Sequence, residues 1–202
     1  MPRPCSTALA VLQGLGIAAT GLVGGSLRMP AHGLKDRLAR QGLQAAGLTT
    51  APAPSPAAET ERAVAVLAAV GDPMQALAAG LCVSLAQRAR PLLLAGGSQM
   101  AAVLALALAL APSGQRPLIA RNTVVATTAW VLDDENNDLR ALLDAIGQRF
   151  GVRPQLQVAG LRFKDCREPA LRDYERGYVK EGVGAGGLAW LWEQSGRSPA
   201  QL

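Results

Sequence analysis

The sequence is poor in aromatic residues, and this shortage limits how its core can be built. Aromatic residues make up 3% of the 202 residues, although half of the chain is hydrophobic. The core must therefore consist mainly of Ala, Leu and Val, whose small side chains suit helices packed closely on a sheet. The length allows one domain with a full core, or a domain with a small appendage.

Cysteine and histidine are also scarce. Cys5, Cys82 and Cys166 lie far apart and show no metal-ligand spacing, so neither a metal site nor a disulfide framework is predicted. Unpaired cysteines are typical of a reducing compartment, and we expect a cytoplasmic protein. His32 is the single histidine and precedes a helical pattern. A place at the start of a helix or on the surface is favoured for it over catalysis.

The chain lacks a basic run, an aromatic ladder and a long apolar segment. Its formal net charge is +5, but the basic residues are scattered, so nothing favours nucleic-acid binding. Phosphorylated small molecules fit this positive balance equally well. The continuous apolar run from Met100 to Ala111 has 12 residues, too few to span a bilayer. An earlier apolar stretch is interrupted by Gln13, Gly14 and Gly16, and helical periodicity explains it better than a signal peptide. We expect no membrane partner.

The remaining pattern alternates helices and strands. Apolar spacing predicts helices over 7–15, 34–48, 59–70, 73–90, 99–110, 134–150, 168–178 and 186–194, and strands over 91–95, 123–128 and 156–163. A Pro-rich loop or linker is predicted at 49–58, and Asp72-Pro73 supplies a helix cap and a first-turn proline. The fold class is therefore α/β, a three-layer Rossmann-like parallel sheet flanked by helices. Three strands are few for so many helices, and the chain opens on a helix. We expect residues 1–202 to be the C-terminal part of a larger domain whose sheet is incomplete at the N-terminus.

Two short segments follow predicted strands. Gly96-Gly97 comes directly after the first strand, and Thr127-Thr128 ends the second. The carboxyl ends of parallel strands share one edge of a sheet, where ligands bind, so both segments are candidates for phosphate or ribose binding. Loops at such positions are also glycine-rich for geometric reasons alone, and both interpretations stay open.

A glycine-rich stretch near the end of the chain is the strongest candidate site. Glu181 is followed by four glycines within six residues. Glycine lets a ligand lie directly on backbone N–H groups, and a neighbouring Glu can serve as a general base. The stretch matches Gly-x-Gly-x-x-Gly through Gly182, Gly184 and Gly187. A dinucleotide-binding fingerprint is nevertheless not favoured, because a polar segment precedes it and the chain ends before a βαβ unit could follow.

Four segments carry a resemblance to a known family: Thr7–Leu12, Val70–Gln75, Leu94–Met100 and Gly177–Gly187. In order and spacing they resemble the nicotinate-nucleotide:dimethylbenzimidazole phosphoribosyltransferases, in the form typical of archaea and cyanobacteria. The resemblance covers nearly all of the chain. It implies transfer of ribose 5-phosphate from nicotinate mononucleotide to dimethylbenzimidazole or a related base, giving nicotinate and an α-ribazole phosphate for the lower loop of cobalamin. It also implies a homodimer, and chemistry that needs neither a metal nor a cofactor.

The resemblance assigns roles to residues of the glycine-rich stretch. Glu181 matches the glutamate of the family's Glu-Gly-x-Gly-Ala motif and would be the general base. Gly182, Gly184 and Gly186 would let the backbone approach the nucleotide. The alternative is that Glu181 caps a helix at the surface and that the glycines form a turn with no ligand.

The chain departs from the family at its start. Family members carry Pro-Gly-Gly-Thr-Thr-Thr before the first matching helix, whereas Pro2–Thr7 in this chain contains no glycine. The part of the domain that precedes this motif in the family is also missing. We therefore expect a fragment, a misassigned start or a decayed copy. The second hypothesis is a truncated, non-catalytic homologue that binds a nucleotide or a partner subunit.

Overall fold

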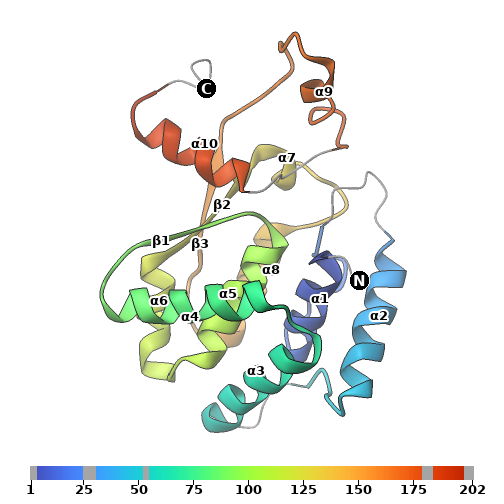
Figure 1. Cartoon of the computed structure of the whole chain (residues 1–202), viewed down its shortest axis with the longest axis vertical. Coiled ribbons are helices and arrows are strands. Elements are labelled where there is room, and N and C mark those ends of the chain that lie inside the picture. Colours follow the sequence, from blue (N-terminus) through green and yellow to red (C-terminus); the bar gives the residue numbers. More distant parts are fainter. Residues whose placement is uncertain (1–3, 25–30, 52–54, 179–183, 198–202) are drawn as a thin grey trace.

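The computed structural model describes residues 4–24, 31–51, 55–178 and 184–197, and Figure 1 shows its arrangement. Within these residues the strands β1 (Leu92–Ala95), β2 (Thr123–Thr128) and β3 (Gln155–Ala159) form one parallel sheet in the order β1-β2-β3. Leu92 lies opposite Thr123, and Val124 lies opposite Gln155. The predicted α/β class with a parallel sheet is confirmed.

Helices flank the sheet on both faces. In chain order they are α1 (Pro4–Gly14), α2 (His32–Ala45), α3 (Pro56–Val70), α4 (Pro73–Gln87), α5 (Ser98–Leu110), α6 (Arg116–Asn122), α7 (Ala129–Leu132), α8 (Leu139–Phe150), α9 (Pro169–Arg172) and α10 (Ala185–Gln194), with a 3₁₀ turn η1 at Ser113–Gln115. Figure 1 shows α10 on one side of the sheet and α4, α5, α6 and α8 on the other. The helix α10 contacts all three strands, so a single helix covers its face of the described sheet.

The core forms around α5, as its continuous apolar sequence predicts. All residues from Ala101 to Ala109 are buried, because α5 packs against α1, α3, α4 and α8. Burial around α4 also raises the pKa of the Cys82 thiol to about 12. A buried thiol of this kind is a poor nucleophile at neutral pH. Among the residues that the structure describes, no helix combines the length and apolarity needed to cross a membrane.

Side-chain caps set where several helices begin. The Asp72 carboxylate accepts a hydrogen bond from the Gln75 backbone N–H while the Gln75 side chain accepts one from the Asp72 N–H, which confirms the predicted cap of α4. The Ser55 hydroxyl caps α3 by accepting one hydrogen bond, from the Ala58 N–H. The predicted loop at 49–58 is therefore three residues too long, since α3 already begins at Pro56.

Three of the predicted boundaries differ from the structure by more than three residues. The helix expected from residue 134 begins at Leu139, because the Asp134 carboxylate accepts a hydrogen bond from the Asn136 N–H and holds a turn instead. The helix expected over 168–178 is reduced to α9, and turns with three-residue spacing follow it up to Gly177, whose φ is 77°. The third strand ends at Ala159 rather than Phe163, because Phe163 turns away from the sheet to pack on Trp130.

A buried ion network joins three helices below the sheet. Glu59 of α3 forms salt bridges with Arg116 of α6 and Arg149 of α8, and all three side chains are at least four-fifths buried. Both guanidinium groups also lie about 5 Å from the ring of Phe150. Charges buried this deeply depend on one another, because each compensates for the lost hydration of its partner.

Candidate functional site

The carboxyl edge of the sheet brings together the two strand-end segments that the sequence singled out. Ala95, the last residue of β1, lies opposite Ala126, so Gly96-Gly97 and Thr127-Thr128 leave adjacent strands side by side. The Gly96 N–H continues the ladder by donating to the Ala126 carbonyl oxygen at 2.8 Å. The prediction that these segments face the same edge is confirmed.

Gly96 and Gly97 differ in backbone conformation and in the space available for a side chain. Gly96 has a φ of 150°, a conformation that other residues rarely adopt. Gly97 precedes the first turn of α5 without a side-chain cap, and a Cβ there would meet Val131 at an ordinary 3.4 Å. The φ of Gly96 therefore favours glycine, whereas at Gly97 there is room for a Cβ. Whether either one touches a phosphate stays a prediction.

Thr127 and Thr128 are buried, with exposed fractions of 0% and 1%. Their side chains therefore stabilise the end of β2 inside the fold. Because both side chains are buried, a ligand could contact their hydroxyl groups only inside the fold, at the carboxyl edge of the sheet. Their role in ribose or phosphate binding stays a prediction.

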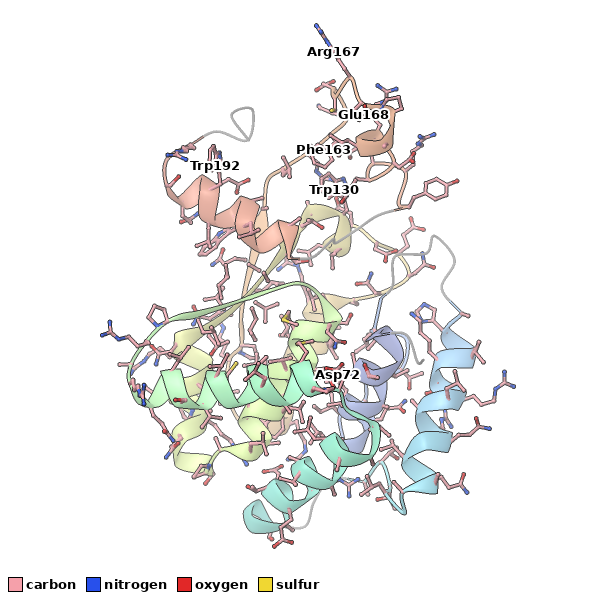
Figure 2. The ribbon with its side chains drawn as sticks, in the orientation of Figure 1. Asp72, Trp130, Phe163, Arg167, Glu168 and Trp192 are labelled. Atoms are coloured by element: carbon pink, nitrogen blue, oxygen red, sulfur yellow. The ribbon has the colours of Figure 1, made fainter. Side chains whose placement is uncertain are left out.

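The loop after α1 and the start of α4 meet the same edge. The Gly24 N–H donates to the Ser98 hydroxyl at 3.1 Å, at the first turn of α5. The Gln99 amide donates to the Asp72 carboxylate at 3.2 Å and so ties the starts of α4 and α5 together. Figure 2 labels Asp72 at this junction. The sequence predicted Asp72 as a cap, but its bond to Gln99 depends on two helices that only the fold brings together.

The glycine-rich stretch also reaches this edge. Gly184 precedes α10 with a φ of 78°, and a Cβ on it would lie 3.1 Å from the Ala95 Cβ. A Cβ on Gly187 would lie 2.4 Å from the Ala95 Cβ, closer than real atoms approach. Gly186 is buried in the first turn of α10. Glu181 and Gly182 lie outside the described residues, so their roles stay predictions.

The close approach at Gly187 predicts a loss of stability when a Cβ is added there. Gly187→Ala should lower the free energy of unfolding by about 1–3 kcal/mol, because the added methyl group overpacks the contact with Ala95. The matched control is Gly80→Ala in α4, where a Cβ meets nothing within 4 Å and helix propensity predicts a gain of about 0.5–1 kcal/mol. Urea denaturation of both variants checks the pair. Equal effects would mean that Gly187 does not pack on β1 as described.

Aromatic residues form a second feature beside β2 and β3. Trp130, Phe163 and Tyr174 pack together with ring centroids 4.8–5.3 Å apart. Trp130 is 5% exposed, so its ring lies in the core. In the described part of the chain, no group of three His, Cys, Asp or Glu side chains could hold a metal ion. His32 begins α2, as predicted.

Comparison with known proteins finds relatives whose names state no activity. No protein-family model matches it. It is 48% identical over 207 residues to a UPF0284 protein of Parasynechococcus marenigrum, an alignment that covers all of this chain and 50% of that relative. It is also 48% identical over 200 residues to a UPF0284 protein of Gloeobacter violaceus, covering 98% of this chain and 48% of that relative. A UPF0284 protein of Methanocaldococcus jannaschii is 38% identical over 191 residues, covering 94% and 49%. The chain thus spans about half the length of the curated relatives it matches.

Proposed function

We propose that this chain carries part of the active site of a phosphoribosyltransferase, which moves ribose 5-phosphate from nicotinate mononucleotide to dimethylbenzimidazole or a related base. One observation carries the proposal. Two glycine-rich segments that lie far apart in the sequence meet at Ala95, where Gly96 continues β1 and Gly187 packs on its end. Ligands of parallel α/β sheets bind beyond this edge. The similarity to cyanobacterial and archaeal proteins supports the same proposal, since the resembled form is typical of those organisms.

In this proposal Glu181 accepts a proton from the acceptor base, and backbone N–H groups bind the phosphate of the nucleotide. The azole nitrogen of the acceptor attacks C1 of the ribose, and the bond from C1 to the nicotinate nitrogen breaks. Glu181 takes the N–H proton that the acceptor loses, and nicotinate leaves with the bonding electron pair. Backbone N–H groups at Gly97 and Gly184 bind the phosphate and ribose and hold C1 close to the acceptor.

The test is a product assay with nicotinate mononucleotide and dimethylbenzimidazole. We expect nicotinate to appear only when the base is present, together with an equal amount of ribosylated base, measured by liquid chromatography. The full-length relative of Parasynechococcus marenigrum is assayed in parallel, because it is about twice as long as the aligned region. Activity in the relative alone, with nucleotide binding by this chain, would identify the chain as a non-catalytic homologue. No transfer by either protein would reject the proposed reaction.

A further inference from the structure

The two outer strands of the described sheet differ in sequence. β3 alternates polar and apolar residues, with Gln155 and Gln157 preceding Leu156 and Val158, a pattern typical of a strand at an edge. β1 is a continuous apolar run, Leu92–Ala95. Such runs are typical of strands buried on both faces of a parallel sheet. β1 therefore has the sequence of an inner strand, although it lies at an edge of the described sheet.

The backbone of β1 has unpaired hydrogen-bonding groups on its outer side. The Gly96 N–H donates to the Ala126 carbonyl oxygen, and successive residues of a strand turn their N–H and C=O groups to opposite sides. The groups of Leu93 and Ala95 therefore point away from β2. Within the described residues β1 pairs with β2 alone, and no hydrogen bond reaches these outward groups. An edge of this kind is a template for another strand.

The helix next to this edge exposes apolar side chains. Met74, Leu77 and Leu81 of α4 are 43%, 68% and 46% exposed, and spacings of three and four residues place them on one side of the helix. α4 contacts β1, and Figure 1 shows it directly below that strand. The open edge and the apolar helix face thus belong to neighbouring elements. We refer to Met74, Leu77, Leu81 and Leu93 as the α4–β1 surface.

This face of α4 is unusual for a helix at the surface. Such helices normally bury an apolar stripe and turn polar residues to water. α8 follows this rule, since its exposed positions are Arg140, Asp144 and Gln148. α4 has no charged residue in its 15 positions, so both its buried and its exposed sides are apolar. Apolar patches that a folded chain leaves exposed commonly mark sites of protein association.

The relatives contain a polypeptide of the right size to cover this surface. Their alignments with this chain cover 50%, 48% and 49% of their lengths, so each carries an unaligned half about as long as the present chain. In those proteins the two halves are covalently joined and meet at high effective concentration. A second copy of this chain fits the edge less well, because a two-fold axis would pair two β1 strands antiparallel in a sheet whose described pairs are parallel.

We propose that the α4–β1 surface binds the half of the UPF0284 relatives that has no aligned counterpart in this chain. A parallel strand of that half pairs with the outward groups of Leu93 and Ala95, and an apolar helix face of it covers Leu77 and Leu81. β1 then becomes an inner strand, as its sequence predicts, and β3 stays the edge. The inference goes beyond the proposed reaction, because Leu77, Leu81 and Leu93 have no part in the transfer step.

Hydrogen exchange on two intact proteins tests the strand pairing. In this chain alone the Leu93 amide should exchange rapidly, because it lacks an acceptor. In the full-length relative of Parasynechococcus marenigrum the aligned amide should exchange at least about tenfold more slowly, because the additional strand accepts from it. The segment aligned with β3 is the internal control and should exchange alike in both proteins. Equal exchange at Leu93, or added protection at β3 instead, would overturn the proposal.

Co-expression tests the contact with α4 and lets the two polypeptides fold together. This chain and the tagged, unaligned half of the same relative should co-purify as a 1:1 complex, measured by size-exclusion chromatography with light scattering. Leu77→Glu places a charge in the apolar contact and should weaken the complex at least about tenfold. Val64→Glu, at a 55% exposed position of α3, is the matched control and should leave it intact. No complex, or equal effects of the two substitutions, would contradict the proposal.

Light scattering of this chain alone tests the alternative partner. A dimer that Leu77→Glu converts into a monomer, while Val64→Glu does not, would place a second copy of the chain on the α4–β1 surface and so reject the proposed partner. A monomer, or a dimer that both variants retain, agrees with the proposal, since the surface is then open to the other polypeptide.

Discussion

Glu181→Gln should lower the rate of the proposed ribosyl transfer about 10²- to 10⁴-fold, the usual contribution of a general base. Glutamine keeps the size of the side chain and can still accept a hydrogen bond, but it cannot take the proton that the azole loses. Substrate binding should change little, because the proposed phosphate and ribose contacts come from backbone groups. Steady-state rates with both substrates separate the loss in kcat from any change in KM.

The pH dependence distinguishes a base from a structural turn. A general base must be ionised, so the unmodified protein should lose the proposed activity as the pH falls through the pKa of that group. The glutamine variant has no such group, and its rate should lack this acidic limb. Glu61→Gln, an exposed position on α3, is the matched control and should retain full activity with an unchanged profile. Nearly full turnover in Glu181→Gln would mean that the base is another group.

Local composition was enough to predict the elements nearest the site. The strand β2 has the predicted bounds because Thr123 to Thr128 is a β-branched run, and α5 is buried because its sequence has no polar face. The adjacency of Gly96 and Thr127 followed from a general property of parallel sheets. These features depend on residues close together in the sequence, or on topology alone.

The wrong predictions share a different cause. Asp134 begins a turn because its carboxylate binds the backbone two residues on, and helical spacing does not reveal that competition. Phe163 leaves the strand pattern because Trp130 and Tyr174 are there to pack on, and both are distant in the sequence. The contact of Gly187 with Ala95 depends on the same kind of long-range packing. A glycine three residues after Gly184 was the one local sign of that close approach.

Loss of the Glu59 carboxylate should be strongly destabilising, because two buried arginines depend on it. Glu59→Ala leaves Arg116 and Arg149 buried without their counter-charge, although each still donates to a backbone carbonyl oxygen, of Leu108 and Leu15 respectively. Breaking a buried pair from one side costs about 3–5 kcal/mol, because the remaining charge is desolvated and uncompensated.

An exposed pair supplies the contrast for this prediction. Arg40 and Asp36 form a salt bridge one turn apart on α2, and the Arg40 side chain is 66% exposed. Arg40→Ala should therefore cost less than about 1 kcal/mol. Urea denaturation gives both free energies of unfolding, and thermal melting should show a loss of about 6–20 °C for Glu59→Ala, at about 2–4 °C per kcal/mol for a chain of this length. Similar small losses in the two variants would mean that water reaches the network around Glu59, so that its charges behave as surface charges and do not hold α3, α6 and α8 together.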